Sequence, residues 1–186
     1  MSIGDKMTGR DAEKLPNFSF RVMSVMLNSY GRLFNVAKLL NDFDIRNGFT
    51  VIDYGCGSGN YVKRASELVG EKGKVLAVDI HPLSEKCINK RARKYGLQNV
   101  AFVLADRYSC PIEENTADMI YALDMFHMVK DHKAFLTELH RLLKAGGYLI
   151  IGDGHQPREA AKSKINSSGL WEIVAESKKY TKCVPK

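Results

Sequence analysis

Between residues 50 and 153 the sequence alternates short β-rich runs with segments of helical character, and this alternation limits the possible folds more than any other feature. Five runs favour strands: TVIDY (50–54), KVLAVD (74–79), VAFVLA (100–105), ADMIYAL (117–123) and GYLIIGD (147–153). Helical segments separate most of these runs, which is typical of a parallel sheet with crossover helices. The sequence therefore predicts an α/β fold with a doubly wound, mostly parallel sheet.

The crossover helices are marked by residues that favour helix starts and ends. They are expected at residues 61–69, 82–96 and 131–144. Pro82 suits the first turn of a helix, and Asp131 is a typical N-cap. Residues 108–116, between the third and fourth strands, contain Pro111 and polar side chains and are expected to be mostly loop.

The N-terminal part of the chain differs from this alternating region. Residues 1–16 are polar and are expected to form a flexible tail. Phe18 to Phe43 carries apolar residues at helical spacing with an interruption at Gly31, which predicts two short helices. We expect residues 17–45 to form an N-terminal helical cap, followed by a core that spans residues 48–186.

The C-terminal part predicts one helix and a hairpin. Residues 158–168 follow a proline and favour a helix, and the β-prone runs 170–177 and 179–185 are joined by a tight turn. The hairpin brings the sheet to seven strands and adds one antiparallel strand at an otherwise parallel edge. We expect residues 1–186 to form a single domain.

Length, charge and cysteine usage narrow the class of protein. A chain of 186 residues with 45% hydrophobic residues supports one sizeable core. No window reaches the roughly 18 apolar residues of a membrane helix, so we expect a soluble, cytoplasmic protein with no membrane partner. The four cysteines are scattered without metal-site or disulfide spacing, so no metal is expected. The net charge of +7 favours an anionic partner, but the basic run 86–94 is typical of a solvated helix face, and nucleic acid is disfavoured without being excluded.

The stretch VIDYGCGSGNYV (51–62) places three glycines, Gly55, Gly57 and Gly59, directly after the first strand. Glycines at this turn let the backbone pass close to a ligand, because they have no Cβ and tolerate positive φ. The dinucleotide fingerprint needs its third glycine one residue later, where this chain has Asn60, and the triphosphate loop ending Gly-Lys-Ser/Thr is missing. A phosphate cradle is therefore disfavoured.

Two carboxylates restrict the ligand further. Asp79 ends the second strand 20 residues after Gly59, where an acidic side chain can accept hydrogen bonds from ribose hydroxyls. Asp53 lies directly before the glycines, where a negative charge repels a pyrophosphate and suits a cation. The pattern indicates a ligand with a ribose, a positive charge and no phosphate.

Across residues 48–186 the chain resembles the class I S-adenosylmethionine-dependent methyltransferases. Four segments carry the resemblance in the family's order: VIDYGCGSGNYV, LAVDIHP, VLADRYSCPIEENTADMIYAL and LHRLLKAGGYLIIGD. It implies S-adenosylmethionine as cofactor, which is a nucleoside with a sulfonium and an amino acid. The implied cofactor-binding residues are Asp53, Gly55, Gly57 and Gly59 at the methionine end, Asp79 at the ribose, Ile80, Asp106 and the Arg107 backbone at the adenine, and Leu123 beside the methionine part. Plain core packing for Ile80 and a loop carboxylate for Asp106 remain open.

The methyl acceptor is less determined by the sequence. His127 follows the fourth strand and is the first candidate for a general base, with His155 and Asp153 after the fifth strand as second choices. A lone histidine that packs or caps a loop is the alternative. The segment after the fourth strand lacks the Asn/Asp-Pro-Pro-Tyr/Phe sequence of enzymes that methylate exocyclic amines of bases or glutamine amides.

We therefore expect methyl transfer to an unidentified small molecule. We expect an apolar or aromatic acceptor in a pocket lined by Met23, Met26, Tyr30 and Phe34. The alternative is that these residues only pack the helices on the sheet. The alternatives are an RNA or protein methyltransferase of the same fold, and a non-catalytic module that binds the cofactor or a partner.

Overall fold

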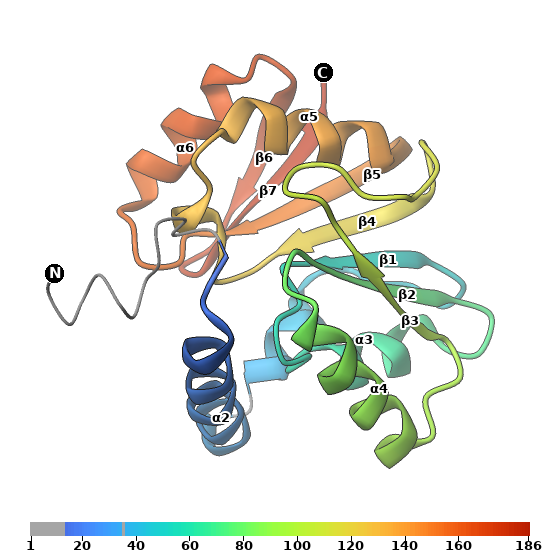
Figure 1. Ribbon diagram of the computed structural model, residues 1–186. Helices are drawn as coiled ribbons and strands as arrows, with labels where there is room; N and C mark the ends of the chain where they lie inside the picture. The colour runs from blue at the N-terminus through green and yellow to red at the C-terminus, as the bar shows by residue number, and fades with distance from the viewer. Residues whose placement is uncertain (1–13, 35) are drawn as a thin grey trace, which may run out of the picture.

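The computed structural model describes residues 14–34 and 36–186, with some side chains of residues 27–34 excepted, and its centre is one seven-stranded sheet (Figure 1). The strand order is β3-β2-β1-β4-β5-β7-β6. The strands are β1 (Thr50–Tyr54), β2 (Lys74–Asp79), β3 (Val100–Leu104), β4 (Ala117–Ala122), β5 (Leu143–Gly152), β6 (Trp171–Glu176) and β7 (Tyr180–Pro185). The five N-terminal strands pair in parallel, and β7 is antiparallel to both of its neighbours. The predicted fold class is confirmed, and the antiparallel strand lies one position in from the edge.

Helices cover both faces of the sheet (Figure 1). They are α2 (Asn17–Phe34), the 3-10 helix η1 (Val36–Asp42), α3 (Val62–Val69), α4 (Leu83–Tyr95), the short 3-10 helix η2 (Phe126–Met128), α5 (His132–Leu142) and α6 (Arg158–Ser167). The cap predicted at Asp131 is present, since its carboxylate accepts a hydrogen bond of 2.9 Å from the Ala134 N–H. Gly96 ends α4 in the left-handed conformation.

Alternate residues of each central strand face opposite sides of the sheet, so the core has two main layers. Ile52 and Ile120 join the layer beneath α5 and α6, whereas Val51 and Met119 join the layer beneath α3 and η1. Asp53 and Tyr121 are register partners in β1 and β4. By the period of two, both face the layer that α3 and η1 cover.

Two boundaries differ from the prediction. The helix break expected at Gly31 does not occur there. Helix α2 continues through Gly31 to Phe34, and η1 begins at Val36. A single glycine costs only about 1 kcal/mol inside a helix, which is too little by itself to end one. Strand β5 begins at Leu143, ahead of the glycine pair, and a register shift against β4 absorbs the extra residues. The expected flexible tail lies mostly outside the described residues.

Within the described residues, none of the helices has the length and apolar character needed to cross a membrane.

Candidate functional site

The carboxyl ends of β1 and β4 form the point at which the strand order reverses, since β1 is flanked by β2 on one side and β4 on the other. In open α/β sheets this crevice is where ligands bind. The loop that follows β1 is fixed to the end of β2, because the Gly55 and Cys56 N–H groups donate to the Val78 carbonyl oxygen at 2.8 and 3.0 Å. From α4, Arg91 donates to the Ser58 carbonyl oxygen and to Asn60 Oδ1 at 2.7 and 2.8 Å.

The three glycines of this loop all have positive φ, with values of 81°, 51° and 78° at Gly55, Gly57 and Gly59. Their surroundings differ. A Cβ at Gly59 would lie 2.6 Å from Ile88 Cδ1, and a Cβ at Gly55 would lie 2.7 Å from Met125 Cγ. A Cβ at Gly57 would meet no atom within 4 Å. Gly57 is therefore the glycine that faces open space, while Gly59 permits close packing of the loop on α4.

Asp79 connects the glycine loop to the end of β2. Its Oδ2 accepts a hydrogen bond of 2.7 Å from the Gly57 N–H, and its Oδ1 accepts one of 2.7 Å from the His81 N–H. Burial raises the pKa of Asp79, and the two backbone donors oppose that rise. Each carboxylate oxygen has a further lone pair, so Asp79 can hold the loop and still accept hydrogen bonds from a ligand.

Asp53 is buried beside the glycine loop with one oxygen unsatisfied. Its side chain is 2% exposed, and neither its Oδ2 nor the Tyr121 hydroxyl has a hydrogen-bond partner in the structure. Burial raises the pKa of Asp53 to about 7; the nearby Tyr121 hydroxyl lowers it, and the charge of Asp79 raises it. A buried carboxylate with an unsatisfied oxygen is an arrangement that a cationic ligand group would complete.

The residues expected at the adenine lie in the loops after β2 and β3. Ile80 is half-buried and packs against the core beneath α5 and α6. Asp106 and Ser109 exchange backbone hydrogen bonds of 2.7 and 3.0 Å, which forms a tight turn with Arg107 at a φ of 52°. The Asp106 side chain is exposed. The turn lies next to the end of β2, because the Ala105 N–H donates to the Asp79 carbonyl oxygen at 3.0 Å.

The loop after β4 contains Leu123, which the sequence predicts at the site, and Asp124, which it does not. Leu123 is buried, and the next residue, Asp124, has a φ of 58° and accepts a hydrogen bond of 3.1 Å from the Tyr61 hydroxyl. Tyr61 in turn contacts Tyr121, with ring centroids 6.1 Å apart. Asp124 is a carboxylate that closely follows a buried strand, which is a sequence pattern typical of a binding site. Tyr121 lies within the strand, and nothing in the sequence distinguishes it from a core residue.

His127 and His155 come together from the loops after β4 and β5. Their rings meet edge to face with centroids 5.0 Å apart. The Nδ1 atom of His127 is buried without a hydrogen-bond partner. Burial lowers the pKa of His127, the His155 ring adds to this effect, and Asp124 opposes it. His127 is therefore held largely as the neutral imidazole near pH 7, which is the form that accepts a proton.

Asp153, the other candidate after β5, is occupied by an ion pair. The Arg158 guanidinium donates to both carboxylate oxygens of Asp153, and its Nη2 lies 2.5 Å from Oδ2. Both side chains are mostly buried, so this bidentate pair fixes the start of α6. The arrangement leaves Asp153 with a structural role.

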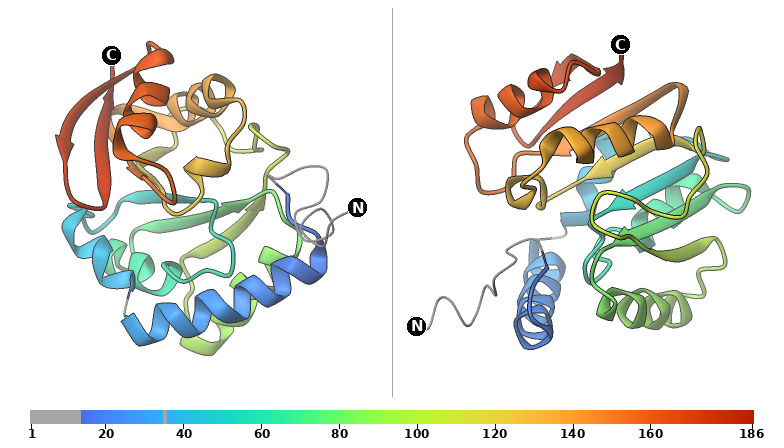
Figure 2. Two further views of the ribbon diagram at one scale, coloured as in Figure 1. Left: turned by 90° about the vertical axis from the view of Figure 1, so that its left-hand side faces the viewer. Right: turned by 45° about the horizontal axis from the view of Figure 1, so that its top comes forward.

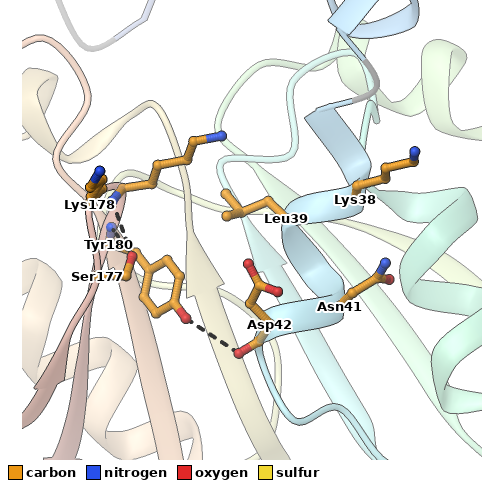
Figure 3. A pocket seen from close by; sticks show the side chains of 8 residues that line it. Lys38, Leu39, Asn41, Asp42, Ser177, Lys178 and Tyr180 are labelled. Carbon is orange, nitrogen blue, oxygen red and sulfur yellow. Dashed lines mark hydrogen bonds between the residues drawn. The ribbon is translucent and has the colours of Figure 1, made fainter.

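A pocket of about 480 Å³ lies between η1 and the turn that joins β6 to β7 (Figure 3). Its lining residues are Lys38, Leu39, Asn41, Asp42, Ser177, Lys178, Lys179 and Tyr180. The Tyr180 hydroxyl donates to the Asp42 carbonyl oxygen at 3.3 Å and connects the two walls. No local pattern predicts this pocket, because residues of its two walls that contact each other are 138 positions apart along the chain.

A row of aromatic rings joins this pocket to the buried Asp53. Phe43 contacts Tyr180 edge to face with centroids 4.9 Å apart, and it contacts Tyr121 at 6.1 Å. Tyr121 lies opposite Asp53 in the sheet. The sequence predicts an acceptor pocket lined by side chains of α2. Two of these side chains, Tyr30 and Phe34, lie outside the described residues. Met23 and Met26 are exposed at 36% and 67%.

Within the described part of the chain, no group of three or more His, Cys, Asp or Glu side chains is placed to hold a metal ion.

Comparison with known proteins assigns the family. Residues 45–185 match the family described as "Methyltransferase domain". This chain belongs to that family. The resemblance to S-adenosylmethionine-dependent methyltransferases expected from the glycine loop and the two aspartates is thereby confirmed.

Individual relatives agree with this assignment. The chain is 33% identical over 131 residues to the "Ubiquinone/menaquinone biosynthesis C-methyltransferase UbiE" of Klebsiella pneumoniae, a match that covers 70% of this chain and 52% of the relative. The chain thus spans about half the length of that relative. A S-adenosylmethionine-dependent methyltransferase from Aquifex aeolicus has a similar structure, with a TM-score of 0.75, 29% identity, and coverage of 87% of this chain and 95% of the other. A putative methyltransferase of the same class from Methanococcus maripaludis shares the fold, with a TM-score of 0.72, 20% identity, and coverage of 91% and 92%.

Proposed function

We propose that this methyltransferase domain transfers a methyl group from S-adenosylmethionine to a small-molecule acceptor. The observation that carries the proposal is the buried Asp53, whose Oδ2 has no partner at the carboxyl end of β1. A cationic amino group would satisfy that oxygen, and the open face at Gly57 leaves room for a ligand beside it. The residues present therefore fit the cofactor.

The binding roles follow from the hydrogen-bonding capacity of each residue. Asp53 would hold the amino group of the cofactor, and Asp79 would accept from the ribose hydroxyls with the lone pairs that Gly57 and His81 do not use. Asp106 and the backbone of Arg107 would lie at the adenine, with Ile80 beneath it. Leu123 would flank the methionine part. When bound, the cofactor supplies a methyl group already activated by a sulfonium.

We place the acceptor in the pocket between η1 and the β6–β7 turn. Leu39 and Tyr180 offer apolar and aromatic surface there, and the buried rings of Phe43 and Tyr121 lie in contact between that pocket and Asp53. The relatives are named as C-methyltransferases of quinone biosynthesis. We therefore propose a carbon atom of an electron-rich ring as the acceptor, which must lose a proton after methylation. His127, largely neutral near pH 7, is the proposed base, and the protein's main task is to align the acceptor and exclude water.

The experiment is transfer of radiolabelled methyl from S-adenosylmethionine to a panel of hydroquinones and phenols. We expect labelled product with the wild-type protein and a higher KM for the acceptor in Leu39→Gln. The matched control is Val174→Gln, which changes an exposed apolar residue on β6 away from the pocket. Affinity for S-adenosylhomocysteine should be equal in all three proteins. Labelling of RNA or protein alone, or cofactor binding without any labelled product, would contradict the proposal.

A further inference from the structure

Helix α2 carries an apolar stripe on its solvent side. Six of the eight large hydrophobic side chains that are exposed in the described part of the chain belong to this helix. Five of them are Phe18, Val22, Val25, Met26 and Leu33, with exposed fractions of 77%, 43%, 67%, 67% and 79%. At 100° per residue these positions fall on one side of the helix. The exposed Ser29 also lies on this side, but an apolar face of this extent is unusual on a water-exposed helix and marks an interaction surface.

The opposite side of α2 is attached to the domain beside the candidate site. Phe20 is buried and stacks on His81, with ring centroids 4.0 Å apart and an interplanar angle of 14°. His81 Nε2 lies 3.1 Å from the Leu15 carbonyl oxygen, and Ser24 is also buried. These contacts fix which side of the helix faces out, so the stripe cannot be buried by rolling the helix onto its own domain.

The charge of this segment favours an anionic partner. From residue 14 to residue 41 the chain contains four cationic residues, Lys14, Arg21, Arg32 and Lys38, and no carboxylate. A second copy of the chain would bring the same positive segment and a net charge of +7 to the interface, which opposes pairing of two stripes. Apolar side chains on one face together with cations and no acids are the pattern of a helix that lies in the surface of an anionic bilayer.

We propose that α2 docks the protein on an anionic lipid surface by inserting this stripe between the headgroups. Figure 2 shows α2 beside the carboxyl ends of the parallel strands. Asp53 lies near the carboxyl end of β1, and Tyr180 of the proposed acceptor pocket pairs with the last residue of β5, so both belong to the same edge. Docking through α2 therefore brings the mouth of the site to the membrane surface, where apolar molecules accumulate. The segment lies outside the region that matches the family model, residues 45–185. This departs from the expectation of no membrane partner, which rested on the lack of a spanning segment.

The test is sedimentation of the full chain with vesicles of phosphatidylcholine alone and with about 30 mol% phosphatidylglycerol. We expect binding to the anionic vesicles that weakens as salt is raised, because the Debye length shortens. The triple variant Val25→Ser, Met26→Ser, Leu33→Ser should bind at least about tenfold more weakly, since less apolar area is buried. The matched control Val174→Ser changes an exposed apolar residue on β6, away from α2, and should bind like the wild type.

Folding is checked separately from docking. Affinity for S-adenosylhomocysteine and the far-ultraviolet circular dichroism should be the same in wild type, triple variant and control, because the stripe residues are exposed on the side of α2 opposite the contact between Phe20 and His81. Equal vesicle binding by wild type and triple variant would overturn the proposal. So would a wild-type dimer in analytical ultracentrifugation that the triple variant converts to a monomer, because the occupant of the stripe would then be a second copy.

Discussion

The loops after β1 and β2 and the loops after β4 and β5 meet at one edge of the sheet, yet they are organised differently. On the β1–β2 side, two side chains hold the loop backbone in place. The Asp79 carboxylate accepts hydrogen bonds from the Gly57 and His81 N–H groups, and Arg91 of α4 donates to the Ser58 carbonyl oxygen. On the β4–β5 side, side chains from two separate loops meet, as the rings of His127 and His155 do. The β1–β2 side suits the proposed cofactor, which is the same in every reaction of this class. The side chains of the β4–β5 side can differ from one enzyme to another, as the methyl acceptor does.

The largest expected effect concerns the buried carboxyl of the β1–β2 side. The pKa of Asp53 is raised by burial to about 7, so the folded protein binds this proton more tightly than the unfolded chain does. The free energy of unfolding should therefore fall as pH rises from about 4 to about 7, by on the order of 4 kcal/mol from this group. Urea denaturation across that pH range should show the fall in the wild type and a correspondingly smaller fall in Asp53→Asn. Parallel pH profiles in the two proteins would disprove the assignment.

The next largest effect concerns Asp79, which holds the β1–β2 side together. Asp79→Ala removes two charge-assisted hydrogen bonds to backbone N–H groups, and we expect a loss of about 3 kcal/mol in the free energy of unfolding. Affinity for S-adenosylhomocysteine should fall at least about 100-fold, because the loop and the ribose lose the same partner. Denaturation and calorimetry measure the two effects. Asp131→Ala, which removes the cap of α5, is the control that should lose about 1 kcal/mol and no affinity.

The third prediction separates the two sides by function. His127→Gln changes the β4–β5 side and should lower kcat about 100-fold while the Kd for S-adenosylhomocysteine stays unchanged. His155→Gln changes only the neighbouring exposed ring and should have a smaller effect on kcat. Single-turnover kinetics and calorimetry give the two quantities. Loss of cofactor affinity in His127→Gln would show that His127 supports the cofactor site and does not act as a base. The proposed division of roles between the β1–β2 and β4–β5 sides would then be wrong.

The smallest effects compare two glycines of one loop. Gly59→Ala would place a Cβ 2.6 Å from Ile88 Cδ1 at a positive φ, and should cost about 2 kcal/mol of stability. Gly57→Ala carries only the conformational penalty, about 1 kcal/mol, because no atom lies within 4 Å of its Cβ. Cofactor affinity should show the reverse order, with the greater loss in Gly57→Ala. Thermal denaturation and calorimetry on the pair would reveal whether the open space at Gly57 belongs to the ligand.

The same contrast explains how much the sequence could predict. The sheet, its hairpin and the residues of the β1–β2 side follow from local patterns: alternating strands and helices, glycines after a strand, and a carboxylate at each of two strand ends. Asp131 as a cap and Gly96 as a helix end are equally local. The prediction of a break at Gly31 was wrong: α2 continues to Phe34, because a single glycine costs only about 1 kcal/mol and does not by itself end a helix.

The β4–β5 side was less accessible because its contacts join distant residues. Tyr121 has the appearance of a core residue, and only the register of β1 and β4 places it opposite Asp53. The pocket between η1 and the β6–β7 turn needs the whole sheet to be assembled before its walls meet. Asp153 was weighed as a catalytic candidate, although Arg158, five residues later, neutralises it. The exposed apolar stripe of α2 is visible only once the buried side, Phe20 and Ser24, is known.

Calorimetric titration of the wild type and of the Asp53→Asn, Asp79→Asn double variant with S-adenosylhomocysteine, NAD and ATP tests the proposed ligand site most directly. We predict that the wild type binds the first ligand alone, and that the double variant, still folded by circular dichroism, loses that binding. Unchanged uptake of S-adenosylhomocysteine by the double variant, or wild-type binding confined to NAD and ATP, would contradict the role given to the two aspartates.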